Sequence, residues 1–248
     1  MKAAAIIQAR MTSSRLPGKV LMELGNRPML QLVIERLQRS ANLSDIIVAT
    51  SAEEADDPIV DLCADLAIPV ARGSRDDVLS RFAGALHLTE AGTIVRVTGD
   101  CPLIDSALID NALAVFATER PDHLSCGSDG GYPRGINAEI IARAALELAA
   151  REAAEPFERE HVTPFLYTRP DRFRLVKMEA PQELRRPDYR ITVDEPADMA
   201  MMEALLKGIG GDPLAISLYD VVAFLDAHPE VAAMNGGVYQ KHFTETGR

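Results

Sequence analysis

Short apolar runs alternate along this chain with longer segments in which apolar residues recur every three or four positions. The run Ala3–Gln8 is short and almost wholly apolar, as expected of a buried strand, whereas Pro28–Gln38 places its apolar side chains on one helical face. The same pattern predicts further strands at Asp45–Thr50, Ile68–Ala71, Thr93–Thr98, His123–Cys126, Phe173–Glu179 and Tyr189–Val193. It predicts further helices at Asp57–Leu66, Asp76–Leu88 (capped by Ser74 or Asp76), Asp105–Thr118, Glu139–Arg151, Glu158–Tyr167, Ala197–Leu206 and Ser217–His228.

Strands separated by helices of this length predict an α/β fold in three αβα layers around a mostly parallel sheet. Ligands of such sheets bind beyond the carboxyl ends of the strands. Residues 126–180 interrupt the regular alternation and include a glycine-rich loop at Gly127–Gly135. We therefore expect one domain over residues 1–248, in which residues 126–180 form an insertion on the substrate or dimer side.

Composition narrows the classes of partner. The net charge of −11 and the lack of a basic run argue against nonspecific nucleic-acid binding. No apolar stretch is long enough for a membrane helix, and the N-terminus enters a strand without a signal-peptide pattern. The three cysteines are widely spaced and form no zinc-binding or disulfide pattern. We expect a cytoplasmic protein with reduced thiols.

The segment after the first strand is a local basic exception in this acidic chain. Arg10, Arg15 and Lys19 fall in a loop that also contains serine, proline and glycine, and the first acidic residue is Glu23. A loop of this kind between a strand and a helix suits a polyphosphate, because its cations and backbone N–H groups all favour an anion. The alternative is a solvated basic loop. Neither the Walker A motif nor the G-x-G-x-x-G fingerprint is present.

The segment Ile7–Leu21 resembles the opening motif of the cytidylyltransferases that activate sugar acids, such as the KDO and acylneuraminate cytidylyltransferases. Arg96–Asp105 and Arg190–Asp198 resemble the second and third motifs of that family. The branch of spore-coat polysaccharide biosynthesis protein F is the most similar, on three further segments: Arg72–Phe82, Tyr132–Glu139 and Glu160–Phe165. The resemblance covers residues 3 to 205.

The resemblance implies a nucleotide-diphospho-sugar transferase-like fold and transfer of CMP from CTP to an acidic sugar, with release of pyrophosphate and with Mg²⁺ as cofactor. It implies that catalysis depends on four residues: Arg15, Lys19, Asp100 and Asp194. Asp100 and Asp194 would be the metal ligands, as Mg²⁺ prefers one or two carboxylates together with phosphate oxygens. The nucleotide would contact Ala9, Arg10, Ser14, Arg15, Lys19, Gly73, Ser74 and Asp100. The sugar would contact Tyr132, Arg134, Gly135, Asn137 and Glu139. Related enzymes are often homodimers.

Plainer structural roles stay open for several of these residues. Asp100 and Asp194 each precede a predicted helix and are candidate caps. Gly73 and Ser74 are candidates for a simple turn before a capped helix, and Arg81 is spaced to pair with Asp77. The other roles left open are a turn at Tyr132–Gly135 and a structural, hydrogen-bonded His161.

Two departures from the better-studied sugar-acid enzymes keep the acceptor undefined: Cys101 stands where they carry a polar residue, and Glu195 adds negative charge beside Asp194. Two other function classes are weighed against the transferase. A nucleotide-sugar-dependent glycosyltransferase would need an Asp-x-Asp motif, which is absent at Gly99–Cys101. A nonenzymatic sugar- or nucleotide-binding protein would keep the basic loop without needing both aspartates.

Overall fold

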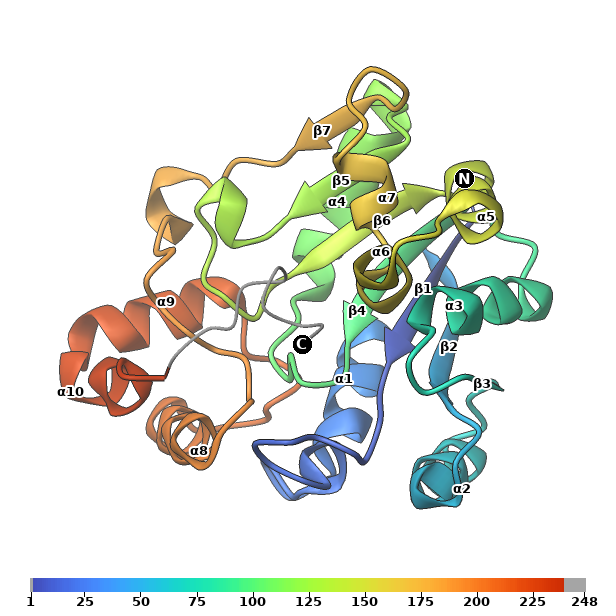
Figure 1. Ribbon diagram of the computed structural model, residues 1–248. Helices are drawn as coiled ribbons and strands as arrows, with labels where there is room; N and C mark the ends of the chain where they lie inside the picture. The colour runs from blue at the N-terminus through green and yellow to red at the C-terminus, as the bar shows by residue number, and fades with distance from the viewer. Residues whose placement is uncertain (1, 239–248) are drawn as a thin grey trace.

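A seven-stranded sheet in the order β3-β2-β1-β4-β6-β5-β7 forms the centre of the computed structural model, which describes residues 2–238 (Figure 1). The first four strands in this order are parallel, β6 runs antiparallel to both its neighbours, and β7 pairs in parallel with β5. The predicted α/β class with a mostly parallel sheet is therefore confirmed. The predicted domain also includes residue 1 and residues 239–248, which lie outside the described residues.

The strands have these bounds: β1 Ala3–Gln8, β2 Leu43–Ser51, β3 Val70–Gly73, β4 Thr93–Thr98, β5 His123–Cys126, β6 Ala138–Ala142 and β7 Leu175–Lys177. The α-helices are α1 Met29–Leu37, α2 Asp57–Asp65, α3 Val78–Ala85, α4 Ser106–Glu119, α5 Arg143–Glu152, α6 Pro156–His161, α7 Pro164–Tyr167, α8 Pro196–Ile209, α9 Leu218–Ala227 and α10 Pro229–Ala232.

Side chains of β1 alternate between two hydrophobic cores, one on each face of the sheet. Ala5 and Ile7 pack into the core beneath α1, α4, α8 and α9, whereas Ala4 and Ile6 pack beneath α3 and α5. Figure 1 shows these two groups of helices on opposite sides of the strands. Because both faces are covered, β1 is apolar along its length, which explains why the sequence shows a continuous run there.

The predicted helix Glu139–Arg151 is wrong at its start. Residues 138–142 form β6, which inserts between β4 and β5, and α5 begins only at Arg143. Ile140 and Ile141 are fully buried on opposite faces of the sheet. Tertiary pairing thus overrides a helical propensity that continues unbroken into α5.

Three other predicted boundaries are corrected. The helix expected over Glu158–Tyr167 divides into α6 and α7, because Val162 adopts a left-handed φ of 74° and Pro164 begins a new helix. The strand expected over Phe173–Glu179 is limited to β7. Within Tyr189–Val193 only Arg190 forms a bridge, to Arg134, so this segment is extended chain and not a strand of the sheet.

Helix caps also differ from expectation. Asp77, and neither Ser74 nor Asp76, caps α3 by accepting a hydrogen bond from the Ser80 N–H group. All three cysteines are free and buried. No helix in the described part of the chain is both long and apolar enough to cross a membrane.

Candidate active site

The carboxyl ends of β1 and β4 meet at the point where the strand order reverses. The chain runs from β1 outward through β2 and β3, then returns to place β4 on the other side of β1. The basic loop follows β1, and Gly99–Asp100 follows β4; the Gly99 N–H group donates to the Gln8 carbonyl at 2.9 Å. This reversal of strand order is where open α/β sheets bind ligands.

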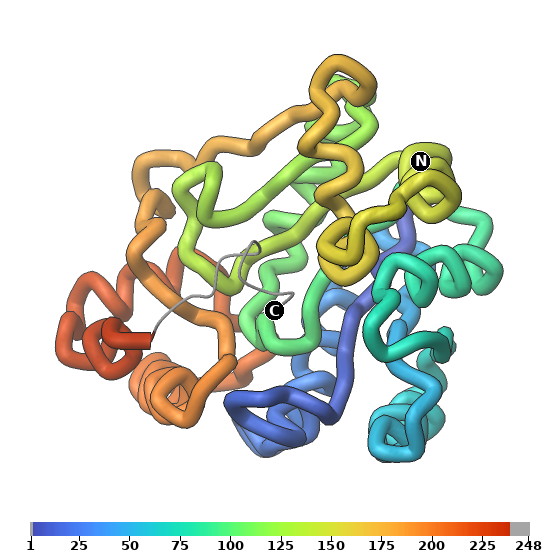
Figure 2. Tube along the Cα trace, in the orientation of Figure 1, coloured from blue at the N-terminus to red at the C-terminus, as the bar shows by residue number. Residues whose placement is uncertain are grey.

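Lys19 joins the two predicted metal ligands. Its ammonium group donates to Asp100 Oδ2 at 2.7 Å, to Asp194 Oδ1 at 2.8 Å and to the Val193 carbonyl at 2.8 Å. Burial opposes the charge of Lys19, but the two carboxylates outweigh it and raise its pKa. Two aspartates nearly a hundred residues apart in the sequence therefore bind the same ammonium group. Figure 2 shows the N-terminal segment, in blue, beside the orange segment that precedes α8.

Two arginines complete a ring of positive charge around Asp194. Arg15 lies 3.0 Å from its Oδ2 and 3.2 Å from Glu195 Oε1, and Arg190 donates to the same Oδ2 at 2.6 Å. Burial alone would raise the pKa of the Asp194 carboxyl, but the positive charges of Lys19, Arg15 and Arg190 have the larger effect, so its pKa is lowered. Arg15 and Lys19 are thus neutralised by distant acids of the protein, which the local sequence did not reveal.

Neither aspartate caps the following helix. Asp105 caps α4, and Glu195 caps α8 in a reciprocal capping box with Asp198. The fully buried Asp198 also accepts hydrogen bonds from the Asp194 N–H group at 2.9 Å and from Arg190 Nε at 2.8 Å. Asp198 and Arg190 therefore hold Asp194 in place, and sequence reasoning missed both roles although they lie in the third motif.

Arg10 differs from the other two cations of the basic loop. Over residues 2–238, no hydrogen bond or ion pair engages its guanidinium group, which lies close enough to Arg81 for the two charges to repel. Burial, followed by this repulsion, lowers the pKa of Arg81. Neither of these two neighbouring guanidinium groups has a carboxylate of the described residues bound to it, which favours an anion at this position.

The Gly73–Ser74 loop lies at the end of β3. Ser74 is exposed, and its hydroxyl oxygen accepts a hydrogen bond from the Asp77 N–H group at 3.1 Å. Arg81 does not pair with Asp77, which binds Arg159 instead; Arg81 donates to the carbonyls of Ser74 and Arg75. A side chain at Gly73 would meet Arg81 Cγ at 3.1 Å, so glycine lets the arginine pack beneath the loop.

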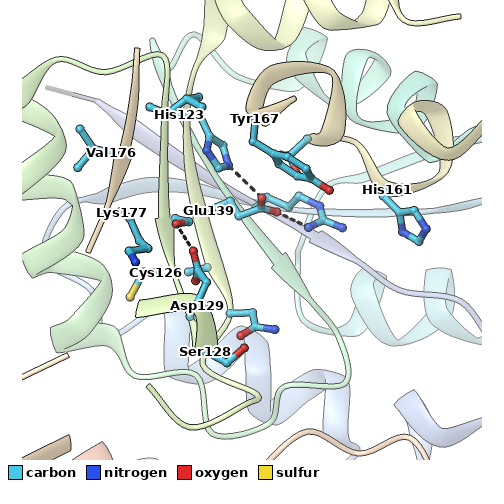
Figure 3. A pocket seen from close by; sticks show the side chains of 16 residues that line it. His123, Cys126, Ser128, Asp129, Glu139, His161, Tyr167, Val176 and Lys177 are labelled. Atoms are coloured by element: carbon cyan, nitrogen blue, oxygen red, sulfur yellow. Dashed lines mark hydrogen bonds and ion pairs between the residues drawn. The ribbon is translucent and has the colours of Figure 1, made fainter. Parts of the chain in front are cut away.

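A cavity of about 650 Å³ opens beside β5, β6 and β7. Figure 3 shows it between the sheet residues His123 and Glu139 and the α6–α7 residues His161 and Tyr167. Arg96 links the cavity to the carboxyl end of β1, because it lies in the cavity wall and also donates to the Gln8 side chain at 3.3 Å. Of the predicted sugar contacts, Asn137 and Glu139 line this cavity.

Glu139, in the cavity wall, binds two basic side chains. It binds Arg96, and His123 Nε2 lies 2.9 Å from its other oxygen (Figure 3). Burial opposes its charge, yet Arg96 and His123 lower its pKa to about 2. Burial also lowers the pKa of His161 and raises that of Tyr167 to about 12, so both side chains are neutral near pH 7. The wall therefore carries balanced charge with several neutral hydrogen-bonding groups.

The other predicted sugar contacts lie outside the cavity lining. Tyr132 is 1% exposed, and its hydroxyl group is 3.5 Å from the Glu179 carbonyl. Gly135 has a φ of 112° and lies against Ile191, where an added Cβ would come within 2.5 Å of the backbone. Arg134 is half-buried near Arg190 and Asp194, and its guanidinium group has no hydrogen bond or ion pair within the described chain. Ser14 is exposed and Ala9 is buried.

Cys101 is buried beside the first aspartate, with its Sγ atom 3.8 Å from Asp100 Oδ1. Burial, and after it the charge of Asp100, raises the pKa of the thiol to about 12. It is a neutral thiol that packs under the aspartate.

The model of the cytidylyltransferase family matches residues 4–234. Spore coat polysaccharide biosynthesis protein SpsF of Bacillus subtilis is 34% identical over 236 residues, which cover 92% of this chain and 95% of that protein. A 3-deoxy-manno-octulosonate cytidylyltransferase of Geobacter sulfurreducens is 40% identical over 119 residues, which cover 47% of this chain and 46% of that protein. The solved structure of a cytidylyltransferase from Leptospira borgpetersenii superposes with a TM-score of 0.87 at 29% identity, covering 98% of this chain and 100% of that one. The chain therefore belongs to the cytidylyltransferase family and is an enzyme of that class, as its motifs predicted.

Proposed function

We propose that this enzyme transfers CMP from CTP to the hydroxyl group of a sugar acid, with release of pyrophosphate, in polysaccharide or glycan biosynthesis. The observation that carries the proposal is the meeting of Asp100 and Asp194 on the Lys19 ammonium group where the strand order reverses. The names of the relatives SpsF and 3-deoxy-manno-octulosonate cytidylyltransferase support the glycan context and the acidic acceptor.

The basic loop would hold the triphosphate. Arg10 offers an unengaged guanidinium group among the described residues, and Arg15 and Lys19 become available when their carboxylates take another cation. Nucleotidyl transfer asks mainly for positioning and for neutralisation of negative charge at the α-phosphate and the leaving pyrophosphate. Three cations on one loop meet that need.

Asp100 and Asp194 suit Mg²⁺ by the chemistry of their donors. Their oxygens already converge on a cation, the Lys19 ammonium group. Within residues 2–238 no group of three or more acidic, histidine or cysteine side chains is arranged to hold a metal, so phosphate oxygens of the nucleotide would have to supply the other ligands. When bound, the ion would neutralise phosphate charge and orient the reacting groups.

The acceptor would occupy the 650 Å³ cavity with its reacting end toward Asp194. Arg134 lies near Asp194, and Asn137, three residues further along the chain, lines the cavity. Arg134 would provide a cation for an acidic acceptor. In the reaction the acceptor oxygen forms a bond to the α-phosphorus, the bond from that phosphorus to the bridging oxygen breaks, and pyrophosphate leaves with the electron pair. The acceptor hydroxyl proton passes to solvent.

The test is pyrophosphate release with CTP, Mg²⁺ and a panel of sugar acids, with ATP, GTP and UTP as matched alternatives. We expect release that depends on CTP and on one acidic acceptor. Binding of CTP without turnover on any acceptor would favour a nonenzymatic role, and absence of binding by any nucleotide would refute the proposal.

A further inference from the structure

Asp56 is a buried carboxylate that the proposed reaction does not use. It lies immediately before α2 and is only 1% exposed. In sequence it is 45 residues from Met11, a residue of the basic loop, yet its Oδ1 atom accepts the Met11 N–H group at 2.6 Å.

The other oxygen of Asp56 is bound to the end of β2. Oδ2 accepts hydrogen bonds from the Ser51 N–H group at 3.1 Å, from the Ser51 hydroxyl group and from the Thr50 hydroxyl group at 3.1 Å. An ionised carboxylate is purely an acceptor, so it satisfies all four donors at once. The side chain thus fixes the basic loop to a rigid strand of the sheet.

Met11 is the residue through which this attachment reaches the cations. Its carbonyl accepts hydrogen bonds from the Ser13 N–H group at 3.0 Å and from the Gly18 N–H group at 2.9 Å. Gly18 adopts a left-handed φ of 73°, and Lys19 follows it directly. The loop therefore folds back onto Met11, and the position of Met11 sets where Arg15 and Lys19 lie.

We propose that Asp56 is a positioning residue of the nucleotide site, which holds the loop from Arg10 to Lys19 in its triphosphate-binding conformation through the Met11 N–H group. The inference rests on the proposed function, because it needs the nucleotide to bind this loop. Asp56 acts through the backbone and touches no reacting atom.

Asp110 provides a matched control. Its carboxylate lies on α4 and also accepts four hydrogen bonds from one short segment. The donors are Ser40 Oγ, Ala41 N, Asn42 N and Asn42 Nδ2. That segment precedes β2, whereas the nucleotide site lies beyond the carboxyl end of β1, a strand parallel to β2. Both substitutions therefore remove a carboxylate that accepts several hydrogen bonds from a loop. Only Asp56 binds a loop of the proposed nucleotide site.

The experiment compares Asp56→Asn and Asp110→Asn in CTP binding by calorimetry and in steady-state kinetics. An amide group at position 56 would present a donor to another donor, which leaves a buried N–H group unpaired, and we expect CTP to bind about tenfold to a hundredfold more weakly. KM for CTP should rise by the same factor, with KM for the acceptor unchanged and with most of kcat recovered at saturating CTP. Asp110→Asn should leave all of these values unchanged.

The outcomes separate the two proposals. If the wild-type enzyme does not bind CTP, the proposed function fails. If it binds CTP and Asp56→Asn binds equally well, or if Asp110→Asn weakens binding to the same degree, the inference about Asp56 is overturned. Should Asp56→Asn fail to fold, Ser51→Ala removes one hydrogen bond that orients the carboxylate, and a rise in KM for CTP of about threefold is then expected. An unchanged KM in Ser51→Ala would overturn the inference in that case.

Discussion

Neutralising Asp100 and Asp194 one at a time should stop turnover in both variants and destabilise them to different degrees. The substitutions are Asp100→Asn and Asp194→Asn, which keep the shape of the side chain and remove its charge. If both carboxylates hold the metal, each variant loses a transition-state interaction, and kcat should fall by about 10²–10³-fold or more.

The difference in stability follows from the contacts of each carboxylate. The Asp194 side chain is 16% exposed and faces Lys19, Arg15 and Arg190. Its loss leaves these three neighbouring cations with one other carboxylate each, Asp100, Glu195 and Asp198, at a cost of about 3 kcal/mol. For a chain of this size this corresponds to a fall in Tm of about 6–12 °C. The Asp100 side chain is 25% exposed and, among the described residues, has one ion pair, with Lys19, worth about 1 kcal/mol. Its loss should lower Tm by about 2–4 °C.

The assays are pyrophosphate release at saturating CTP and thermal unfolding followed by circular dichroism. Turnover within about threefold of the wild-type rate in Asp100→Asn would refute the role of this carboxylate in catalysis. An equally severe loss of stability in both variants would show that the two aspartates mainly hold the fold together.

Three further predictions follow from single side chains. Arg10→Ala should raise KM for CTP about tenfold while Tm stays within about 1 °C, because its guanidinium group has no partner to lose within residues 2–238; an unchanged KM would place the triphosphate elsewhere. Gly135→Ala should destabilise the enzyme by about 2 kcal/mol or more in urea unfolding, because its φ of 112° is strained for alanine and the added Cβ lies 2.5 Å from Ile191. Gly210→Ala, at a φ of 72° with nothing within 4 Å of the added Cβ, is the matched control and should cost less. The folded-state pKa of Glu139, about 2, lies below its ordinary value of 4.5, so its stabilisation is present above pH 4.5 and is lost as the pH falls toward 2. Urea unfolding from about pH 5 to about pH 2 should show a shallower loss of stability in Glu139→Gln than in the wild type, and parallel curves would contradict this.

The sequence predicted the parts of this enzyme that depend on local pattern. The apolar run of β1 and the basic loop after it lie where expected, and the carboxyl ends of β1 and β4 meet as parallel strands require. The partners of the cations could not be predicted from the local sequence. Lys19 reaches Asp100 and Asp194 only after the sheet has assembled, so a loop that looked unbalanced is neutralised from far along the chain.

The antiparallel insertion was the hardest part to predict. Residues of β6 and α5 form one stretch with good helix formers, and only the space between β4 and β5 selects a strand for its first part. The cavity could not be predicted from the sequence either, because its walls come from β5, β6 and β7 together with α6 and α7, which meet only in the folded protein. The assignment of Tyr132, Arg134 and Gly135 to sugar contacts stays a prediction, as does the homodimer.

The most direct test of the central claim is a crystal structure with CTP and Mn²⁺, collected at a wavelength where manganese scatters anomalously. We predict one anomalous peak bound by the carboxylates of Asp100 and Asp194 and by phosphate oxygens of the nucleotide. Lys19 should then have moved from the carboxylates to the triphosphate, which the Arg10–Lys19 loop surrounds. A manganese ion bound without either aspartate, or a nucleotide away from this loop while Lys19 keeps its two carboxylate partners, would contradict the account.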